Sequence, residues 1–307
     1  MRGTPVSLLD YPRPGSPAVS AATAISPGEA LLSGRIARSV DAREWAEIRR
    51  RATLRLLRMH YESRVGHLGG NLSCLDMMLH LYTQTLGPDD HFVLSKGHAA
   101  GALYICLWMM DKLSDEELCL FHKDGTRLCG HPPAGGIDEV LFATGSLGHG
   151  LSLACGLSLA KQLKREPGRV FCLMSDGEWN EGSCWEALIF AAHRRLENLV
   201  ILTDLNGLQG FGTTKEVADL GSLTDKLQSF GVEAIEIDGH DFESIRHALE
   251  LDVVGPLAIL ARTRKGRGIS FMENRMEWHY LPMSEMQYNQ AVQEINDECA
   301  MLFASHS

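Results

Sequence analysis

The sequence predicts an α/β fold in which a parallel sheet is flanked by helices. Short apolar runs of strand length, as at residues 169–174 and 199–202, alternate with longer segments whose apolar residues recur at helical spacing. Polar and glycine residues begin shortly after these two runs, at Asp176 and Asn206, as is typical of the carboxyl ends of buried parallel strands. At 307 residues the chain is long enough to bury a large core, and we expect one sizeable domain over residues 41–307.

The first half of the chain is predicted to be mainly helical. Helices are expected where apolar residues recur at helical spacing, and one short apolar run predicts a strand. In chain order these are an amphipathic, arginine-rich helix over 41–62, a helix over 72–86, a strand over 91–95, a helix over 97–112 and a short helix over 114–121. Ser114 and Glu117 have the spacing of a capping box, which predicts where the last of these helices begins.

The second half is predicted to alternate between strands and helices, as βαβ units require. Residues 148–165 are rich in small side chains and predict a helix that packs closely on the sheet. In chain order, the remaining elements are strands beginning at residues 169, 198, 232 and 256, helices beginning at 184, 221 and 241 between them, and a final helix over 284–302.

Composition excludes several classes of partner and location. The formal net charge of −10 and the pI of about 5.7 argue against nucleic acid or an anionic membrane as a partner. No apolar run reaches the roughly 18 residues that would suggest a membrane span. The eight cysteines show no Cys-x-x-Cys spacing, which is typical of reduced core residues in a cytoplasmic protein. Residues 1–40 are rich in Pro, Ala, Ser and Gly, and we expect a mobile extension, with organellar targeting as the alternative.

The most informative motif is the run Ser175-Asp176-Gly177-Glu178-Trp179-Asn180-Glu181-Gly182, followed by Asn206-Gly207-Leu208 after the next apolar run. Mg²⁺ prefers oxygen ligands, and proteins usually supply one or two carboxylates or carbonyls while phosphate oxygens and water supply the rest. Asp176 and Asn206 fit that role, and Gly177 allows the backbone to approach a diphosphate closely. The alternative is that Asp-Gly and Asn-Gly are turn dipeptides that close two strands.

Histidines form a second group of candidates. His67, His98, His131 and His279 lie in predicted loops, widely separated in sequence, and loops can bring such residues together at one end of a sheet. Histidine titrates near neutrality, which suits reactions that interconvert hydroxyl, ketone and aldehyde groups. The role of His149 is left open. Other histidines lie in helix patterns and are interpreted as structural or solvated: His60, His80, His122, His193 and His247.

Taken together, these motifs resemble the thiamine diphosphate-binding half of transketolase, specifically the N-terminal subunit of the split, two-gene form. The resemblance covers about residues 45–288 and rests on seven segments in order: Gly66-His67-Leu68-Gly69-Gly70, Phe92-Val93-Leu94-Ser95-Lys96-Gly97-His98, Gly130-His131-Pro132, Thr144-Gly145-Ser146-Leu147-Gly148-His149-Gly150, the Asp176/Asn206 pair, Asp238-Gly239-His240-Asp241 and Trp278-His279. Ser175 and Tyr280 depart from the family, which usually has glycine at both positions, and Tyr280 is expected to narrow the substrate channel.

The resemblance implies a set of site residues. Asp176, Asn206 and Leu208 would bind Mg²⁺, and thiamine diphosphate would contact His67, Gly145, Leu147, Gly177, Glu178, Asn206 and His279. The implied catalytic residues are His67, His98, His131, His279 and Glu181. Glu181 would belong to an acid network between two cofactor sites, although an acidic residue at a helix amino terminus is also favourable for the helix itself.

The resemblance also implies an activity and a partner. The expected reaction is transfer of a two-carbon ketol unit from a ketose to an aldose, on sugars or sugar phosphates, with the cofactor activated by a glutamate of a pyrimidine-binding domain. That domain is missing from this sequence, so we expect a C-terminal transketolase subunit as partner, in a heterotetramer. The alternatives are another thiamine diphosphate enzyme, either 1-deoxyxylulose-5-phosphate synthase-like or 2-oxoacid decarboxylating, and a non-catalytic regulatory subunit.

Overall fold

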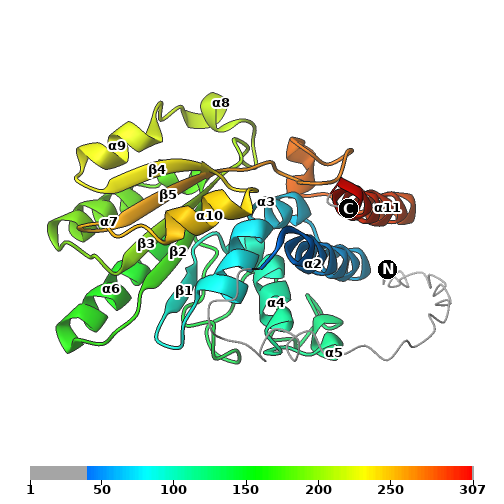
Figure 1. Cartoon of the computed structure of the whole chain (residues 1–307), viewed down its shortest axis with the longest axis horizontal. Helices are drawn as coiled ribbons and strands as arrows, with labels where there is room; N and C mark the ends of the chain where they lie inside the picture. The colour runs from blue at the N-terminus through cyan, green and yellow to red at the C-terminus, as the bar shows by residue number, and fades with distance from the viewer. Residues whose placement is uncertain (1–39, 306–307) are drawn as a thin grey trace, which may run out of the picture.

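A sheet of five parallel strands forms the centre of the molecule (Figure 1). The structure is a computed structural model that describes residues 40–305, so the predicted N-terminal extension, apart from Val40, lies outside the described residues. The strand order is β1-β2-β3-β5-β4, with bounds β1 His91–Leu94, β2 Val170–Ser175, β3 Leu199–Leu205, β4 Glu233–Asp238 and β5 Leu257–Arg262. The parallel sheet expected from the sequence is therefore confirmed.

Helices cover both faces of the sheet. Along β2, Phe171 and Leu173 face one apolar cluster while Cys172 and Met174 face the other, because successive side chains of a strand point to opposite faces. The first cluster includes α3 (Leu68–His80), α4 (Ala100–Met109) and α10 (Phe242–Leu249), and the second includes α6 (His149–Lys164), α7 (Gly182–His193) and α9 (Leu223–Ser229).

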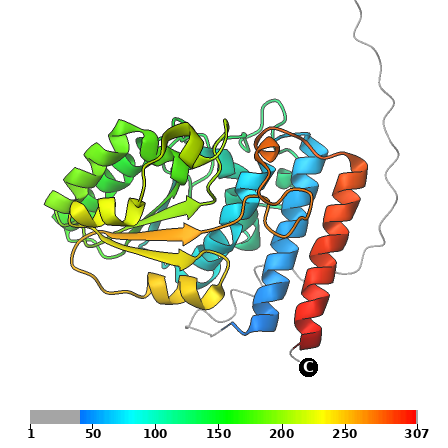
Figure 2. The same cartoon turned by 90° about the horizontal axis from the view of Figure 1, so that it is seen from above.

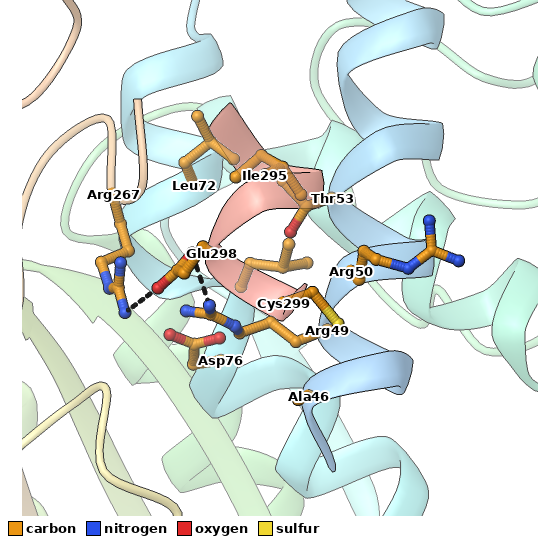
Figure 3. A pocket seen from close by; sticks show the side chains of 11 residues that line it. Ala46, Arg49, Arg50, Thr53, Leu72, Asp76, Arg267, Ile295, Glu298 and Cys299 are labelled. Atoms are coloured by element: carbon orange, nitrogen blue, oxygen red, sulfur yellow. Dashed lines mark hydrogen bonds and ion pairs between the residues drawn. The ribbon is translucent and has the colours of Figure 1, made fainter. Parts of the chain in front are cut away.

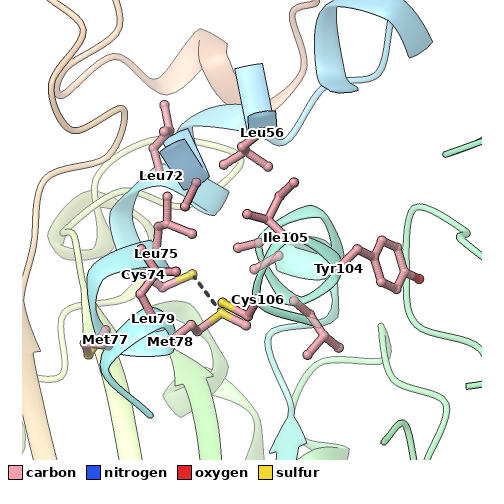
Figure 4. Close-up of a cluster of buried hydrophobic side chains, with 14 of the residues drawn as sticks. Leu56, Leu72, Cys74, Leu75, Met77, Met78, Leu79, Tyr104, Ile105 and Cys106 are labelled. Atoms are coloured by element: carbon pink, nitrogen blue, oxygen red, sulfur yellow. Dashed lines mark hydrogen bonds between the residues drawn. The ribbon is translucent and has the colours of Figure 1, made fainter. Parts of the chain in front are cut away.

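Apolar side chains of the first cluster fill the contact between α3 and α4. Leu75 of α3 and Ile105 of α4 point into the space between the two helices, while Leu72 of α3 and Leu56 of α2 (Ala42–Ser63) lie close by (Figure 4). All four are at most 2% exposed. Removing one such side chain typically costs about 2–5 kcal/mol of stability, so the relative placement of α3 and α4 is strongly fixed.

Helix α11 (Glu285–Ser305) lies beside α2, as Figure 2 shows, and partly buried charges join the two. Arg49 of α2 is 2.7 Å from Glu298 of α11, and Arg267 of the loop after β5 donates to the same carboxylate at 3.0 Å (Figure 3). The final helix is thereby tied to α2 and to the loop that follows β5.

Most predicted elements are present, with shifts at their ends. The capping box of Ser114 and Glu117 is confirmed at α5 (Asp115–Leu118). The helix expected from residue 72 begins at Leu68, and its C-terminal part is a π-helical turn, η1 (Leu81–Thr85). The helix predicted from residue 97 opens with a 3₁₀ turn, η2 (Gly97–Ala99), and His122 was wrongly assigned to a helix, since it lies in a turn with a φ of 59°.

Three further short elements complete the described chain. The segment after β2 forms a 3₁₀ turn, η3 (Asp176–Asn180), and a second one, η4 (Met276–His279), precedes α11. A short helix that the sequence pattern did not predict, α8 (Thr214–Ala218), follows β3. None of the helices in the described part is both long enough and apolar enough to cross a membrane.

Candidate active site

A cavity of about 300 Å³ lies where segments following the carboxyl ends of β1, β2, β3 and β5 meet. This is the edge at which parallel α/β sheets generally bind ligands. All the predicted site residues except Glu178 and Glu181 line this cavity: His67, His98, His131, Gly145, Leu147, Asp176, Gly177, Asn206, Leu208 and His279. The sequence was therefore a good guide to which distant segments meet.

The four predicted histidines gather on one side of the cavity. The His67 ring is central, with its centroid 5.7 Å from His98, 5.7 Å from His131 and 5.0 Å from His279. They come from different elements: His67 precedes α3, His98 lies in η2, His131 is in a loop, and His279 ends η4. The backbone also joins them, since the N–H of His67 donates to the carbonyl of His279 at 3.0 Å.

These imidazoles are held in the neutral form. Burial lowers the pKa of His67 to about 4 and that of His279 to about 3, and nearby histidines and lysines add to both effects. Burial also holds the pKa of His98 well below, and that of His131 below, the ordinary value. A neutral imidazole has one N–H donor and one acceptor nitrogen, so each ring can both donate and accept a hydrogen bond near pH 7.

Lys265 was missed by the sequence interpretation and lies in the cavity wall. Its side chain is 2% exposed, and its Nζ is 3.3 Å from Nδ1 of His279 and 3.4 Å from the carbonyl of Leu208. Because an ammonium can only donate, Nδ1 of His279 accepts and its ring proton lies on Nε2. Burial, with the charge of Lys96, lowers the pKa of Lys265 to about 8. A lysine within the segment Arg264-Lys265-Gly266 after a predicted strand was the available signal.

Asp176 joins the loops that follow β2 and β3. One of its carboxylate oxygens accepts from the N–H of Gly177 at 2.8 Å, and the other accepts from the N–H of Gly207 at 2.7 Å. Burial and the nearby charge of Asp204 raise the pKa of Asp176 to about 7. The site therefore places a carboxylate where negative charge is unfavourable unless a cation compensates it.

A buried ion pair beneath the cavity orients Asn206. Asp204, at the end of β3, pairs with Lys96, and both side chains are at most 1% exposed. The Nδ2 group of Asn206 donates to Asp204 at 2.9 Å, which fixes the direction of the Asn206 amide. Lys96 outweighs the effect of burial and holds the pKa of Asp204 below its usual range. This pair was also missed, although a charged residue in an otherwise apolar strand was a visible signal.

Glu178 and Glu181 lie outside the cavity lining. Glu178 is fully buried, and its carboxylate accepts from the hydroxyl of Ser95, the N–H of Gly148 at 3.1 Å and the N–H of Ser175 at 2.8 Å. Hydrogen bonds within the protein thus occupy the carboxylate oxygens of Glu178. Glu181 is exposed at the N-cap of α7, where its Cβ lies against Gly148.

Glycine and the two departures from the family pattern shape the cavity wall. Gly145 has a φ of 132°, and a Cβ at this position would lie 2.8 Å from the His131 ring, so a larger residue would displace that ring. Ser175 lines the cavity together with Gly177. Tyr280 lines it as well, and its hydroxyl donates to the carbonyl of Gly210 at 3.1 Å, bridging the loops that follow β3 and η4.

Comparisons with known proteins identify the family. The family described as "Transketolase, thiamine diphosphate binding domain" matches residues 49–303. The chain is 36% identical over 260 residues to an apulose-4-phosphate transketolase subunit of Phocaeicola vulgatus, covering 81% of this chain and 92% of that protein. It is 35% identical over 273 residues to the 6-deoxy-6-sulfo-D-fructose transketolase subunit SqwG of Clostridium sp. strain MSTE9, covering 85% of this chain and 98% of that protein.

A solved transketolase has the same fold. The transketolase of Campylobacter jejuni superposes with a TM-score of 0.74 at 26% identity, covering 83% of this chain and 42% of that one, so the chain matches less than half of the solved protein. The alternative enzyme classes considered from the sequence are not favoured, because these relatives are all named as transketolases. The chain belongs to the transketolase family, as a thiamine diphosphate-binding N-terminal subunit of the split kind.

Proposed function

We propose that this subunit binds Mg²⁺ and thiamine diphosphate in the cavity and, with a pyrimidine-binding partner subunit, transfers a two-carbon ketol group from a ketose to an aldose. The observation that supports it best is the meeting of four neutral histidines with Asp176 and Lys265 in one cavity. Groups that can hydrogen-bond sugar hydroxyls and carbonyls thus lie beside groups suited to an anion and its cation.

The residues present fit a magnesium diphosphate. Asp176, the Asn206 side chain and the Leu208 carbonyl supply oxygen donors of the kind Mg²⁺ prefers, and the raised pKa of Asp176 indicates a carboxylate that a cation would stabilise. Gln209 supplies a complementary donor, because its Nε2 is buried without a hydrogen-bond partner among the described residues and the side chain lines the cavity. A phosphate oxygen would satisfy this amide, and Lys265 would contribute positive charge.

Each group of residues has a separate role in the proposed reaction. When bound, thiamine diphosphate supplies the electron sink for breaking and forming the carbon–carbon bond. His67, His98 and His131 accept hydrogen bonds from donor hydroxyls and donate N–H hydrogen bonds to a developing oxyanion, since their lowered pKa values keep them neutral at pH 7. Lys265 fixes the tautomer of His279, whose Nε2–H remains available for a hydrogen bond.

Contacts of Glu178 and Glu181 stay predictions. Because the Glu178 carboxylate is occupied by Ser95, Gly148 and Ser175, a cofactor contact at this position would come from its backbone. Glu181 is exposed beside the start of α7, which supports a contact with a partner subunit.

The partner is proposed to be a C-terminal transketolase subunit, in a heterotetramer. The naming of the relatives as subunits supports this, and so do the exposed apolar side chains at the cavity edge, Leu147 at 38% and Phe211 at 86%. Sugars or sugar phosphates are the proposed substrates. Among the described residues lining the cavity, Lys265 is the one lysine or arginine, so we assign recognition of an anionic substrate tail to the partner.

We further propose a cytoplasmic location and a single domain over residues 41–307. All eight cysteines are free thiols, most of them buried, which supports a reducing compartment. The two apolar clusters share one sheet, which supports one folding unit over the described residues.

The test is a ketol-transfer assay on the purified chain alone and mixed with a pyrimidine-binding transketolase subunit. We expect turnover in the mixture when both Mg²⁺ and thiamine diphosphate are added, and none from the chain alone. Asp176→Asn removes the charged metal ligand and is expected to abolish the activity of the mixture. Asp252→Asn is the matched control, since Asp252 is exposed in the loop before β5, at the opposite edge of the sheet.

Two outcomes would contradict the proposal. Turnover by the chain alone at an ordinary enzymatic rate, on the order of 1 s⁻¹ or more, would exclude the need for a partner. Equal activity of Asp176→Asn and Asp252→Asn, at limiting Mg²⁺, would remove Asp176 from the metal site.

A further inference from the structure

One buried amide beneath the cavity contacts the backbone of two of the four histidines. Asn71, in the first turn of α3, is 0% exposed. Its Nδ2 group donates to the carbonyl of His67 at 2.8 Å and to the carbonyl of His98 at 3.1 Å, while its Oδ1 accepts from the N–H of Ala102 at 2.7 Å. Both Nδ2 protons and the carbonyl oxygen are therefore used, and all three partners are backbone groups.

The first partner, His67, has a backbone conformation that needs support. Its φ of 66° is in the left-handed region, which is uncommon for residues other than glycine and costs on the order of 1–3 kcal/mol. The His67 carbonyl accepts twice from Asn71, from its backbone N–H at 3.1 Å and from Nδ2. The His67 N–H is held by the carbonyl of His279. Asn71 thus supports one side of a strained residue whose ring lies at the centre of the histidine group.

The second partner region is the start of α4, where His98 lies just before the helix. The N-cap residue is Ala99, whose side chain cannot accept from the free N–H groups of the first turn. Oδ1 of Asn71 takes that role for Ala102 from a different helix. Gly101 permits this approach, because a Cβ there would lie 3.0 Å from Oδ1 of Asn71 and 2.5 Å from Nε2 of His60.

We infer that Asn71 is a positioning residue for catalysis, which sets the separation of His67 and His98 by holding both of their carbonyls on one side chain. Its catalytic consequence rests on the proposed function, whereas the geometry it fixes does not. Catalytic groups misplaced by about 1 Å can cost about 100-fold in rate. Asn71 does not line the cavity, so it acts through the two histidines and not on the substrate.

The test compares Asn71→Ala with a matched control, Asn198→Ala. Asn198 is likewise an asparagine whose amide holds another segment, with Nδ2 donating to the carbonyl of Ser158 at 3.1 Å and Oδ1 accepting from the Ser158 hydroxyl at 2.6 Å. It precedes β3 at the edge of the sheet opposite the cavity. Both variants lose the hydrogen bonds of a buried or half-buried amide. Only the amide of Asn71 is bonded to the histidines of the cavity.

The first readout is independent of activity: the side-chain NMR signals of histidines in the purified chain, without cofactor. We expect Asn71→Ala to shift the ring signals of His67 and His98 while leaving those of exposed His193 and His247 in place, and Asn198→Ala to shift neither cavity signal. Unchanged His67 and His98 signals in a folded Asn71→Ala protein would overturn the inference and leave Asn71 with a role in stability alone. If Asn71→Ala does not fold, Asn71→Ser is measured instead, because serine keeps one donor and deprives one of the two carbonyls of its partner.

The second readout is kinetic, on the complex with the partner subunit. We expect Asn71→Ala to lower kcat by up to about 100-fold while changing cofactor affinity less than about 3-fold, and Asn198→Ala to keep the wild-type kcat. Equal kcat values for both variants would overturn the catalytic part. If the histidine signals move as expected but wild-type complex transfers no ketol group, the proposed function fails and the positioning role stands.

Discussion

At the scale of single residues, burial divides the histidines into groups that differ in what they contact. The cavity histidines are neutral because they are buried beside one another and beside Lys265. His60 is neutral for a simpler reason: it is 2% exposed in α2, where Nδ1 lies 3.3 Å from the carbonyl of Val65 and the ring packs against Phe121. Protonation of a neutral buried histidine outside the cavity therefore changes the stability of the fold and not the catalytic reaction.

The first prediction concerns acid stability and His60. Burial lowers the pKa of His60 from 6.5 to about 4, so below pH 6.5 the unfolded chain binds a proton that the folded chain does not. The free energy of unfolding therefore falls as the pH drops from 6.5 to 4, and at about 1.36 kcal/mol per unit the contribution of His60 is about 3 kcal/mol. We expect the stability difference between wild type and His60→Gln to shrink by about that amount over this range.

Urea unfolding at a series of pH values measures this difference, with His247→Gln as the control. His247 lies on α10 with its side chain 66% exposed, so its replacement should leave the pH dependence unchanged. If His60→Gln and wild type lost stability in parallel from pH 6.5 to 4, the ring of His60 would not be the buried neutral group described above.

Individual site residues were predictable when a local motif marked them and were missed when their partners lie far away in sequence. His67, His98 and His131 were found because each stands next to glycine in a loop pattern. Asn71 looked like an ordinary helix residue, because its partners His98 and Ala102 are 27 and 31 residues away. Lys96 and Asp204 pair across 108 residues, so the charge of Asp204 in an apolar strand could mark it as unusual but could not identify its partner.

At the scale of elements, single side chains hold the active-site edge together by accepting hydrogen bonds from several helices and strands. The Glu178 carboxylate joins the end of β1 through Ser95, the start of α6 through Gly148 and the end of β2 through Ser175. Helix α6 approaches so closely that a Cβ at Gly150 would clash with Ser95. These junctions explain how a loop such as residues 144–148 can present Gly145 and Leu147 to the cavity with a fixed backbone.

The second prediction is that Glu178→Gln destabilises the fold by about 3 kcal/mol. The amide retains one acceptor oxygen, and its NH₂ group would face donors, which leaves buried N–H groups without partners. Thermal or urea unfolding measures the loss, with Glu186→Gln on the exposed face of α7 as the control expected to stay within about 0.5 kcal/mol of wild type. A large fall in cofactor affinity with unchanged stability would instead assign the Glu178 side chain to the cofactor.

Element types were easier to predict than element ends. The strands follow from apolar runs, and their parallel order follows from the helices between them. The start of α3 was missed because Leu68-Gly69-Gly70 has the composition of a loop. Tertiary packing overrides that preference: a Cβ at Gly69 would lie 3.2 Å from Lys265 and from Trp278, so glycine here lets α3 approach the cavity loops.

At the scale of the whole molecule, the described chain presents a cavity with one apolar side open. Leu147 and Phe211 line it while remaining exposed, and Tyr280 at its edge is 54% exposed. Apolar groups exposed around a ligand cavity favour a second protein surface that completes it.

The third prediction is that Mg²⁺ and thiamine diphosphate tighten association between this chain and a pyrimidine-binding subunit. A ligand held between two subunits stabilises the assembled state, and at about 100 times its dissociation constant the gain is about 2.7 kcal/mol, or about a hundredfold in the association constant. Light scattering or sedimentation of mixtures, with and without both ligands, measures this change.

The control is the Asp176→Asn variant, which should associate with the partner as wild type does when no ligands are present. Mg²⁺ and thiamine diphosphate should not raise its association constant, because the carboxylate joining the loops after β2 and β3 is the one expected to bind the cation. An association constant that saturating Mg²⁺ and thiamine diphosphate leave unchanged would mean that the cofactor lies within one subunit and does not bridge the two.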